Sequence, residues 1–180
     1  MAAGDARSGA AGHSGPGAGA AAHGVAAAGV ERHGYAGAGA EGDGAAAAAA
    51  SRLRLVKAAE LSGATAQTSG MVRAAAISGE LVGAQSLWMS RTVLTAGASS
   101  GDHHHGESET GIFVVSGSPA FVFRDPASGE VVRLEPEPGD YVWVPPHVPH
   151  REENRSPDTE AVVVIARSTQ EAIVVNVSSL

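Results

Sequence analysis

The sequence predicts an all-β domain of the sandwich or barrel kind. Two observations carry this prediction: short segments rich in Val, Ile and aromatic residues recur along the chain, and Gly, Pro and Asp turns separate them. The first candidate strand is Met71–Ile77, while residues 53–61 fit either a strand or a short helix. The other candidate strands lie within residues 85–97, 111–117, 119–125, 131–140, 141–145, 160–168 and 172–177.

Alternation within these segments predicts which side chains face the core. In residues 85–97, Trp88, Ser90 and Thr92 share one face of the strand, and Leu87 and Met89 share the other. In residues 141–145, Tyr141 and Trp143 alternate with two valines. One face of each segment must therefore close a core.

The composition divides the chain into a tail and one domain. Residues 1–52 are mostly Ala and Gly with scattered polar residues, which bury too little apolar surface to offset the entropy of ordering a chain, so we predict a disordered tail. Residues 53–180 form the predicted single domain. The net charge of -7 argues against a nucleic-acid partner, and the absence of cysteine excludes thiolate ligands and cysteine nucleophiles. No apolar run approaches the roughly 20 residues that span a bilayer, so we expect a cytoplasmic protein.

Five of the eight histidines lie between residues 103 and 150. His103 and His105 are two residues apart, which on an extended strand points both rings to one face. A neighbouring strand could add His150. Imidazole and carboxylate groups bind borderline divalent metals, so the pattern predicts a metal site.

These segments resemble the two motifs of the cupin superfamily, G-x5-H-x-H-x3,4-E-x6-G and G-x5-P-x-G-x2-H-x3-N. Gly97, His103, His105, Glu109 and Gly117 fit the first motif, with one extra residue before the final glycine. The second motif is fitted by Gly139, Pro145, His147, His150 and Asn154, although His147 stands where the family has glycine. The resemblance covers roughly the last hundred residues and is to small single-domain cupins of the RmlC-like type.

The resemblance implies a jelly-roll β-barrel, a homodimer and one divalent ion, which the donor types allow to be Zn, Fe, Mn or Ni. Carried over position by position, the implied ligands are His103, His105, Glu109 and His150. Because of the extra residue, Thr110 would take the place of Glu109 on a regular strand, and a bulge near Gly106 would restore the glutamate. Two alternatives are open. Three histidines alone could hold the ion, or a strand shifted by one residue could make His104 a ligand in place of its neighbours.

Two further residues are candidates for the chemistry. His147 is either a solvent-facing turn residue or a proton carrier at the rim of the pocket, because imidazole titrates near neutral pH. Arg73 alternates with apolar neighbours and is either a surface arginine or an anchor for a carboxylate or phosphate. Asn154 is expected to support its loop by bonding to the backbone.

The expected function is that of a metal-dependent enzyme acting on a small organic molecule. The ion would act as a Lewis acid in an isomerase, cyclase or lyase reaction, with His147 or hydroxide as the base. Small cupins, polyketide cyclases among them, host such reactions. An Fe(II) dioxygenase and a non-catalytic metabolite-binding cupin are the alternatives.

Overall fold

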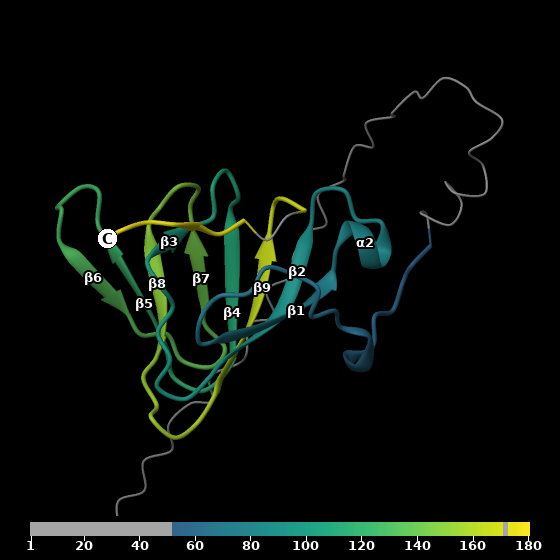
Figure 1. The fold of residues 1–180 in the computed structure, drawn as a ribbon, viewed down its shortest axis with the longest axis horizontal. Coiled ribbons are helices and arrows are strands. Elements are labelled where there is room, and N and C mark those ends of the chain that lie inside the picture. The colour runs from purple at the N-terminus through teal and green to yellow at the C-terminus, as the bar shows by residue number, and fades with distance from the viewer. Residues whose placement is uncertain (1–51, 171–172) are drawn as a thin grey trace, which may run out of the picture. The chain divides into compact units, whose positions relative to one another are not determined.

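A computed structural model of the chain describes residues 52–170 and 173–180 (Figure 1). The predicted disordered tail therefore lies outside the described residues, except for Arg52. Among the described residues, no helix is long and apolar enough to cross a membrane. Nearly all the regular secondary structure of the described residues is strand, in agreement with the predicted fold class.

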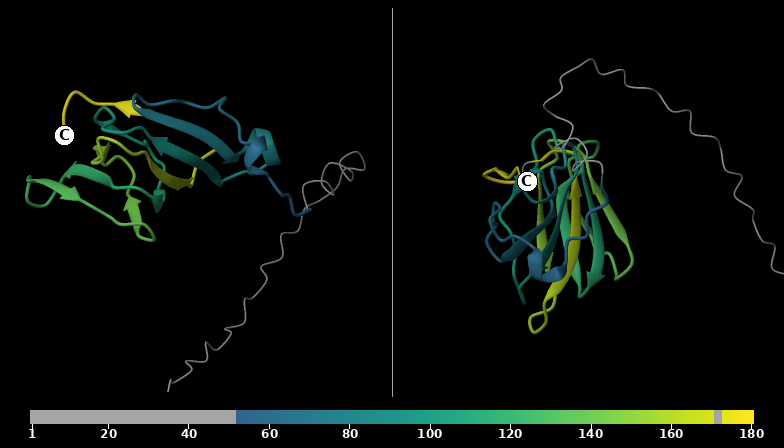
Figure 2. Two further views of the ribbon diagram at one scale, coloured as in Figure 1. Left: turned by 90° about the horizontal axis from the view of Figure 1, so that it is seen from below. Right: turned by 90° about the vertical axis from the view of Figure 1, so that its right-hand side faces the viewer.

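The strands form two antiparallel sheets of five strands each, with the orders β1-β2-β9-β4-β7 and β10-β3-β8-β5-β6. Figure 1 shows the strands fanning across the view from β6 to β1, and Figure 2 turns the two sheets through 90°. Two short helices, η1 and α2, precede and follow β1. The bounds of the elements are η1 Ala58–Glu60, β1 Met71–Ile77, α2 Gly79–Val82, β2 Trp88–Leu94, β3 His103–His104, β4 Thr110–Ser116, β5 Pro119–Arg124, β6 Val131–Leu134, β7 Tyr141–Val144, β8 His150–Asn154, β9 Ala161–Arg167 and β10 Val175–Asn176.

The alternation predicted from the sequence fixes the inward faces of the first sheet. Trp88, Ser90 and Thr92 of β2 are buried, and Val142 and Val144 of β7 are buried while Tyr141 and Trp143 are exposed. The same period of two buries Ile112 and Val114 of β4 and Val163 and Ile165 of β9, which complete the hydrophobic core. Phe113 lies half-buried on the outer face of β4, where its ring centre is 4.8 Å from that of Tyr141.

One buried side chain ties the loops at the end of the barrel together. The side-chain nitrogen of Asn154 donates hydrogen bonds to the carbonyl oxygens of Leu94, Thr95 and Thr159, at 3.2, 3.1 and 2.7 Å. The prediction that Asn154 supports its loop through the backbone is therefore confirmed. Because β8 also carries His150, this anchoring holds the strand that presents the second half of the site.

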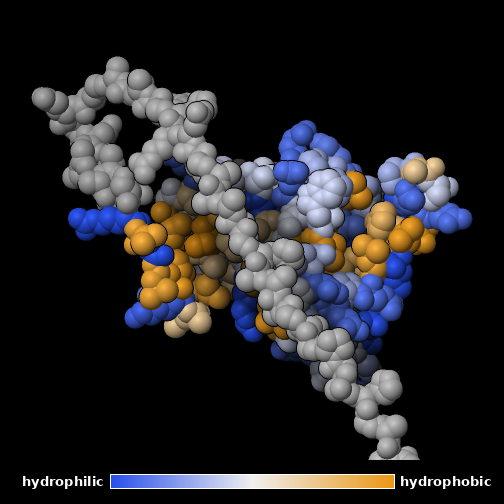
Figure 3. All heavy atoms as spheres, turned by 180° about the vertical axis from the view of Figure 1, so that it is seen from behind, coloured by the Kyte–Doolittle hydropathy of each residue, from blue (hydrophilic) through white to orange (hydrophobic). Residues whose placement is uncertain are grey.

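The surface differs between the two sheets. On the outer face of the first sheet, Val115, Tyr141 and Trp143 are 45, 78 and 64% exposed. The outer face of the second sheet carries ion pairs among Arg133, Glu135, Arg151, Glu153 and Asp102. On the face shown in Figure 3, hydrophobic side chains gather towards both sides of the view.

Candidate metal centre

Four side chains converge inside the barrel, and each could offer one ligand atom to a metal ion. These atoms lie within 4.8 Å of one another, and all four side chains are buried. His103 lies on β3, His105 directly follows the end of β3, and His150 and Glu152 lie on β8. His103 lies directly opposite His150 across the antiparallel pair of β3 and β8, which explains how distant segments meet.

The hydrogen bonds of the three histidines leave one ring nitrogen free on each. Nδ1 of His103 donates to the carbonyl of Gly101 at 2.8 Å, and Nδ1 of His150 donates to that of Val148 at 2.9 Å. Nδ1 of His105 lies 2.8 Å from the hydroxyl oxygen of Thr110. A carbonyl only accepts, so Nδ1 of His103 and His150 carries the proton and Nε2 keeps its lone pair. The free lone pairs are therefore those that face the centre of the cluster.

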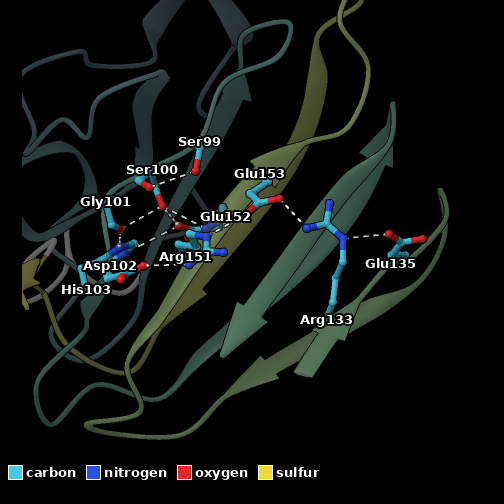
Figure 4. A network of polar contacts seen from close by, with 10 residues as sticks. All are labelled: Ser99, Ser100, Gly101, Asp102, His103, Arg133, Glu135, Arg151, Glu152 and Glu153. Carbon is cyan, nitrogen blue, oxygen red and sulfur yellow. Dashed lines mark hydrogen bonds and ion pairs between the residues drawn. The ribbon is translucent and has the colours of Figure 1, made fainter. Parts of the chain in front are cut away.

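In the carboxylate of the cluster, Glu152, one of the two oxygens accepts a hydrogen bond and the other does not. Its Oε2 accepts a hydrogen bond of 2.9 Å from the hydroxyl of Ser100, as Figure 4 shows. Its oxygens lie 3.6 Å from Nε2 of His103 and 3.8 Å from Nε2 of His150, which is too far for hydrogen bonds. Glu152 follows His150 by two residues, so both side chains point to the same face of β8.

The electrostatics of the cluster keep its groups in the form that a cation needs. Burial lowers the pKa of His150, and burial together with the nearby charge of Arg167 lowers the pKa of His105 far below its ordinary value. Burial alone would raise the pKa of Glu152, but the adjacent histidines in their protonated form, the Ser100 hydroxyl and the charge of Arg73 outweigh it and lower that pKa. At neutral pH, His105 and His150 are therefore neutral and Glu152 is ionised.

A divalent cation fits this set of groups. Nε2 of the three histidines and Oε1 of Glu152 are buried and have no hydrogen-bond partner among the described residues. Four buried polar atoms without partners would be costly unless something between them satisfies them. Three imidazoles and one carboxylate also match the donors that Zn, Fe, Mn and Ni accept, with coordination positions left open.

The structure does not bring Glu109 to this cluster. Glu109 is exposed, and its backbone N–H donates to the hydroxyl of Ser168 at 3.0 Å. Strand β4 begins regularly at Thr110, without a bulge before it, so the buried Thr110 takes the inward position and bonds to His105. Glu152 was not predicted as a ligand. It lies two residues after His150, which is the same spacing that placed His103 and His105 on one face.

His147 and His104 lie outside the cluster. His104 is half-buried, and its Nδ1 accepts a hydrogen bond from the backbone N–H of Gly106 at 3.0 Å. The exposed His147 pairs with Glu107, Nε2 to Oε1, at 2.9 Å. Its φ of 60° is the left-handed conformation that favours glycine, which explains why the family motif has glycine at this position.

Two arginines lie in the interior as well. Arg73 and Arg167 are each 1% exposed, so Arg73 is not the surface residue that one alternative predicted. Arg167 stands opposite Thr110 in the pairing of β9 with β4, and Thr110 in turn contacts His105. The burial of Arg167 could not be predicted from the sequence, because an arginine at the end of an apolar strand is ordinarily exposed.

A pocket of about 250 Å³ adjoins the cluster at His150. Its other lining residues are almost all apolar and come from β5, β6, β7 and the loops that follow β5 and β7. They include Phe121, Phe123, Leu134, Val142, Val144 and Val148. His147 is not among the lining residues. The pocket therefore offers an apolar environment next to one of the four potential ligands.

Comparison with known proteins agrees with this fold and site. The model of the cupin domain matches residues 90–166, which include all four residues of the cluster. No curated protein matches the chain. The family match identifies residues 90–166 as a cupin domain, and the two-sheet barrel with histidines from β3 and β8 agrees with that class.

Solved structures of the same fold include several cupins. Peruvianin-I, described as a cysteine peptidase from Thevetia peruviana latex, has a TM-score of 0.54 and 18% identity, covering 66% of this chain and 77% of its own. An oxalate oxidase has a TM-score of 0.54 and 17% identity, with 64 and 59% covered. The oxalate decarboxylase of Bacillus subtilis has a TM-score of 0.54 and 15% identity, with 62 and 28% covered. At these identities the similarity shows the fold alone, and this chain has no cysteine to act as a peptidase nucleophile.

Proposed function

We propose that the chain is a metal-dependent enzyme that isomerises, cyclises or cleaves a small organic molecule. The observation that carries this proposal is the buried set of four unpartnered ligand atoms beside an apolar pocket. When bound, a divalent ion supplies Lewis-acid chemistry, polarising a carbonyl, enol or carboxylate oxygen so that a proton leaves the adjacent carbon more readily.

The residues of the chain supply binding, orientation and exclusion of water. The Gly101 and Val148 carbonyls and the Thr110 hydroxyl orient the three imidazoles, and such outer partners commonly change metal affinity roughly 10–100-fold when lost. Apolar side chains such as Phe121 and Val142 would cover the body of the substrate. By excluding water, they would strengthen every electrostatic interaction at the reacting atoms.

The role of His147 as the base has less support. Its ring is 56% exposed, pairs with Glu107 and does not line the pocket. That role remains a prediction, which the variant His147→Gly tests without strain, since glycine tolerates the left-handed backbone there.

The proposed reaction predicts hydrogen exchange at carbons next to a carbonyl. Full-length protein loaded with Zn or Mn would be incubated in D2O with a panel of small keto acids and diketones, and loss of the C–H signals would be followed by NMR. We expect wild type and His104→Ala to lose these signals faster than His103→Ala does. Of the two substituted histidines, His103 belongs to the cluster and His104 does not. If His147 is the base, His147→Gly will also be slow while its metal content is unchanged.

Two further readouts separate the alternatives. Water-proton relaxation of the Mn-loaded protein reports whether an open position exchanges water, as a reactive site requires and a closed structural site forbids. Oxygen uptake by the Fe(II)-loaded protein would instead favour the dioxygenase. A metal without exchangeable water, together with no exchange on any compound, would contradict the enzymatic proposal and favour a structural or binding role.

We also propose a homodimer formed through the outer face of β4 and β7. Phe113 pairs with Tyr141 and Gly111 with Trp143 across these strands, so large exposed aromatic rings share one face. Covering them would remove apolar surface from water, whereas the ion pairs on the other sheet are already satisfied there. Light scattering should show a dimer that Trp143→Glu dissociates and Val131→Glu, a change at an exposed valine of β6, leaves intact. A monomeric wild type would refute the proposal.

A further inference from the structure

Two buried arginines have hydrogen-bond donors that no described residue accepts. These donors are Nε of Arg73 and both Nε and Nη2 of Arg167, and each side chain is only 1% exposed. Burying a guanidinium and leaving its N–H groups unpaired costs free energy, so such groups ordinarily face a partner. The missing partner must be an acceptor, because a guanidinium only donates.

Arg167 presents these donors in the geometry that binds a carboxylate. Its Nη1 donates to the carbonyl of Ile173 at 3.1 Å, and its guanidinium lies 5.4 Å from the ring centre of Trp88. These two contacts fix the guanidinium and leave Nε–H and Nη2–H free. Nε and Nη2 form one edge of the planar group, and that edge matches the two oxygens of a carboxylate.

Arg73 contributes charge from a fixed position on β1. Its Nη1 donates to the carbonyl of Ala66, and its Nη2 donates to the hydroxyl of Thr68 at 3.3 Å. Both partners lie in the segment before β1, so Nε remains as the single free donor. Burial, followed by the positive charge of Arg73, lowers the pKa of Arg167 to about 10.

The charge balance of the interior favours an anion. Among the buried side chains that the structure describes, Arg73 and Arg167 are positive and Glu152 is the one carboxylate. A divalent cation at the cluster would add further positive charge. A small anion would offset this excess, which is otherwise expensive in a low-dielectric interior.

A pocket of about 450 Å³ shares lining residues with the surroundings of both arginines, although neither arginine lines it. Its lining includes Ala66, which holds Arg73, and Trp88, over which Arg167 lies. The lining also includes Ala75, on the same face of β1 as Arg73. The one carboxylate in the lining belongs to the exposed Glu80 of α2, so no buried negative charge opposes an anion there.

We propose that Arg167 and Arg73 form a carboxylate-binding site beside the metal cluster, with the free edge of Arg167 as its anchor and small organic acids as its ligands. This inference rests on the proposed function and extends it by naming its substrate class. Arg167 is paired with Thr110 across β9 and β4, and Thr110 contacts the ring of His105, so the bound acid group would lie near His105. The recognition itself depends on the arginines alone.

The test uses NMR of the side-chain Nε–H groups in the full-length, 15N-labelled protein. The probe is acetate, and acetamide, which has nearly the same shape without the charge, is the control at matched ionic strength. We expect acetate to move the Arg167 Nε–H resonance to a saturating limit and acetamide to leave it in place. Arg167→Lys keeps the charge but loses the paired donors, so acetate binding should weaken roughly 10-fold or more. Arg91→Met, at an exposed arginine of β2, should bind like wild type.

Measuring metal content in the same samples keeps the two proposals apart. Acetate that binds at Arg167 in a protein unable to retain metal would support the carboxylate site and contradict the metalloenzyme. If the metal is retained but neither the Arg167 nor the Arg73 resonance moves with acetate, the carboxylate site is refuted and the metal proposal stands. Equal shifts with acetate and acetamide would also refute it.

Discussion

Glu152→Gln should cost the protein its metal ion, while Glu109→Gln should leave the ion in place. The two substitutions are the same chemical change, an ionised carboxylate replaced by a neutral amide of similar size. Glu152 is 2% exposed and lies within 4.8 Å of the three histidine ligand atoms, whereas Glu109 is exposed. Removing the one negative ligand should weaken binding by more than the roughly 10–100-fold that loss of an outer partner causes.

Elemental analysis after dialysis measures the difference directly. Wild type and Glu109→Gln should retain close to one equivalent per chain, and His150→Ala should behave like Glu152→Gln. Metal lost from Glu109→Gln but kept by Glu152→Gln would overturn the assignment. It would mean that the chain before β4 rearranges into a bulge and brings Glu109 to the ion. A circular dichroism spectrum of each variant separates metal loss from unfolding.

Gly117→Ala should give the largest loss of stability among the glycine variants. Gly117 closes the first cupin motif with φ of 84°, and an added Cβ would lie 2.5 Å from Cα of Ala161 and 2.7 Å from the carbonyl oxygen of Glu160. Left-handed strain costs about 1–2 kcal/mol and the clash with rigid backbone adds about 1–3 kcal/mol. We expect a loss of about 3 kcal/mol, a large part of the stability of an ordinary domain.

The matched control is Gly129→Ala, which has φ of 72° but nothing within 4 Å of the new Cβ. It should lose only about 1 kcal/mol, because it carries the strain without the clash. Urea unfolding of metal-free protein measures both, provided that the m-value stays constant. Equal losses in the two variants would show that the approach of β4 to β9 at Gly117 is not rigid.

The sequence alone predicted the fold class and three of the four cluster residues. Strand positions followed from alternation, since side chains on one face recur every two residues and that face must be buried. The same period of two made His103 and His105 neighbours on one face, and the second motif pointed to His150. These properties are local, so they can be recognised without the fold.

Only the tertiary structure decided which carboxylate joins the histidines and where the arginines lie. The family spacing pointed to Glu109, but the start of β4 at Thr110 sets which residue faces inward, and a shift of one position exchanges the two faces. Arg167 is buried because it lies on the inward face of β9, the face that also buries Val163 and Ile165. Burial and cross-strand pairing depend on residues far apart in the chain, so the spacing of a motif does not determine them.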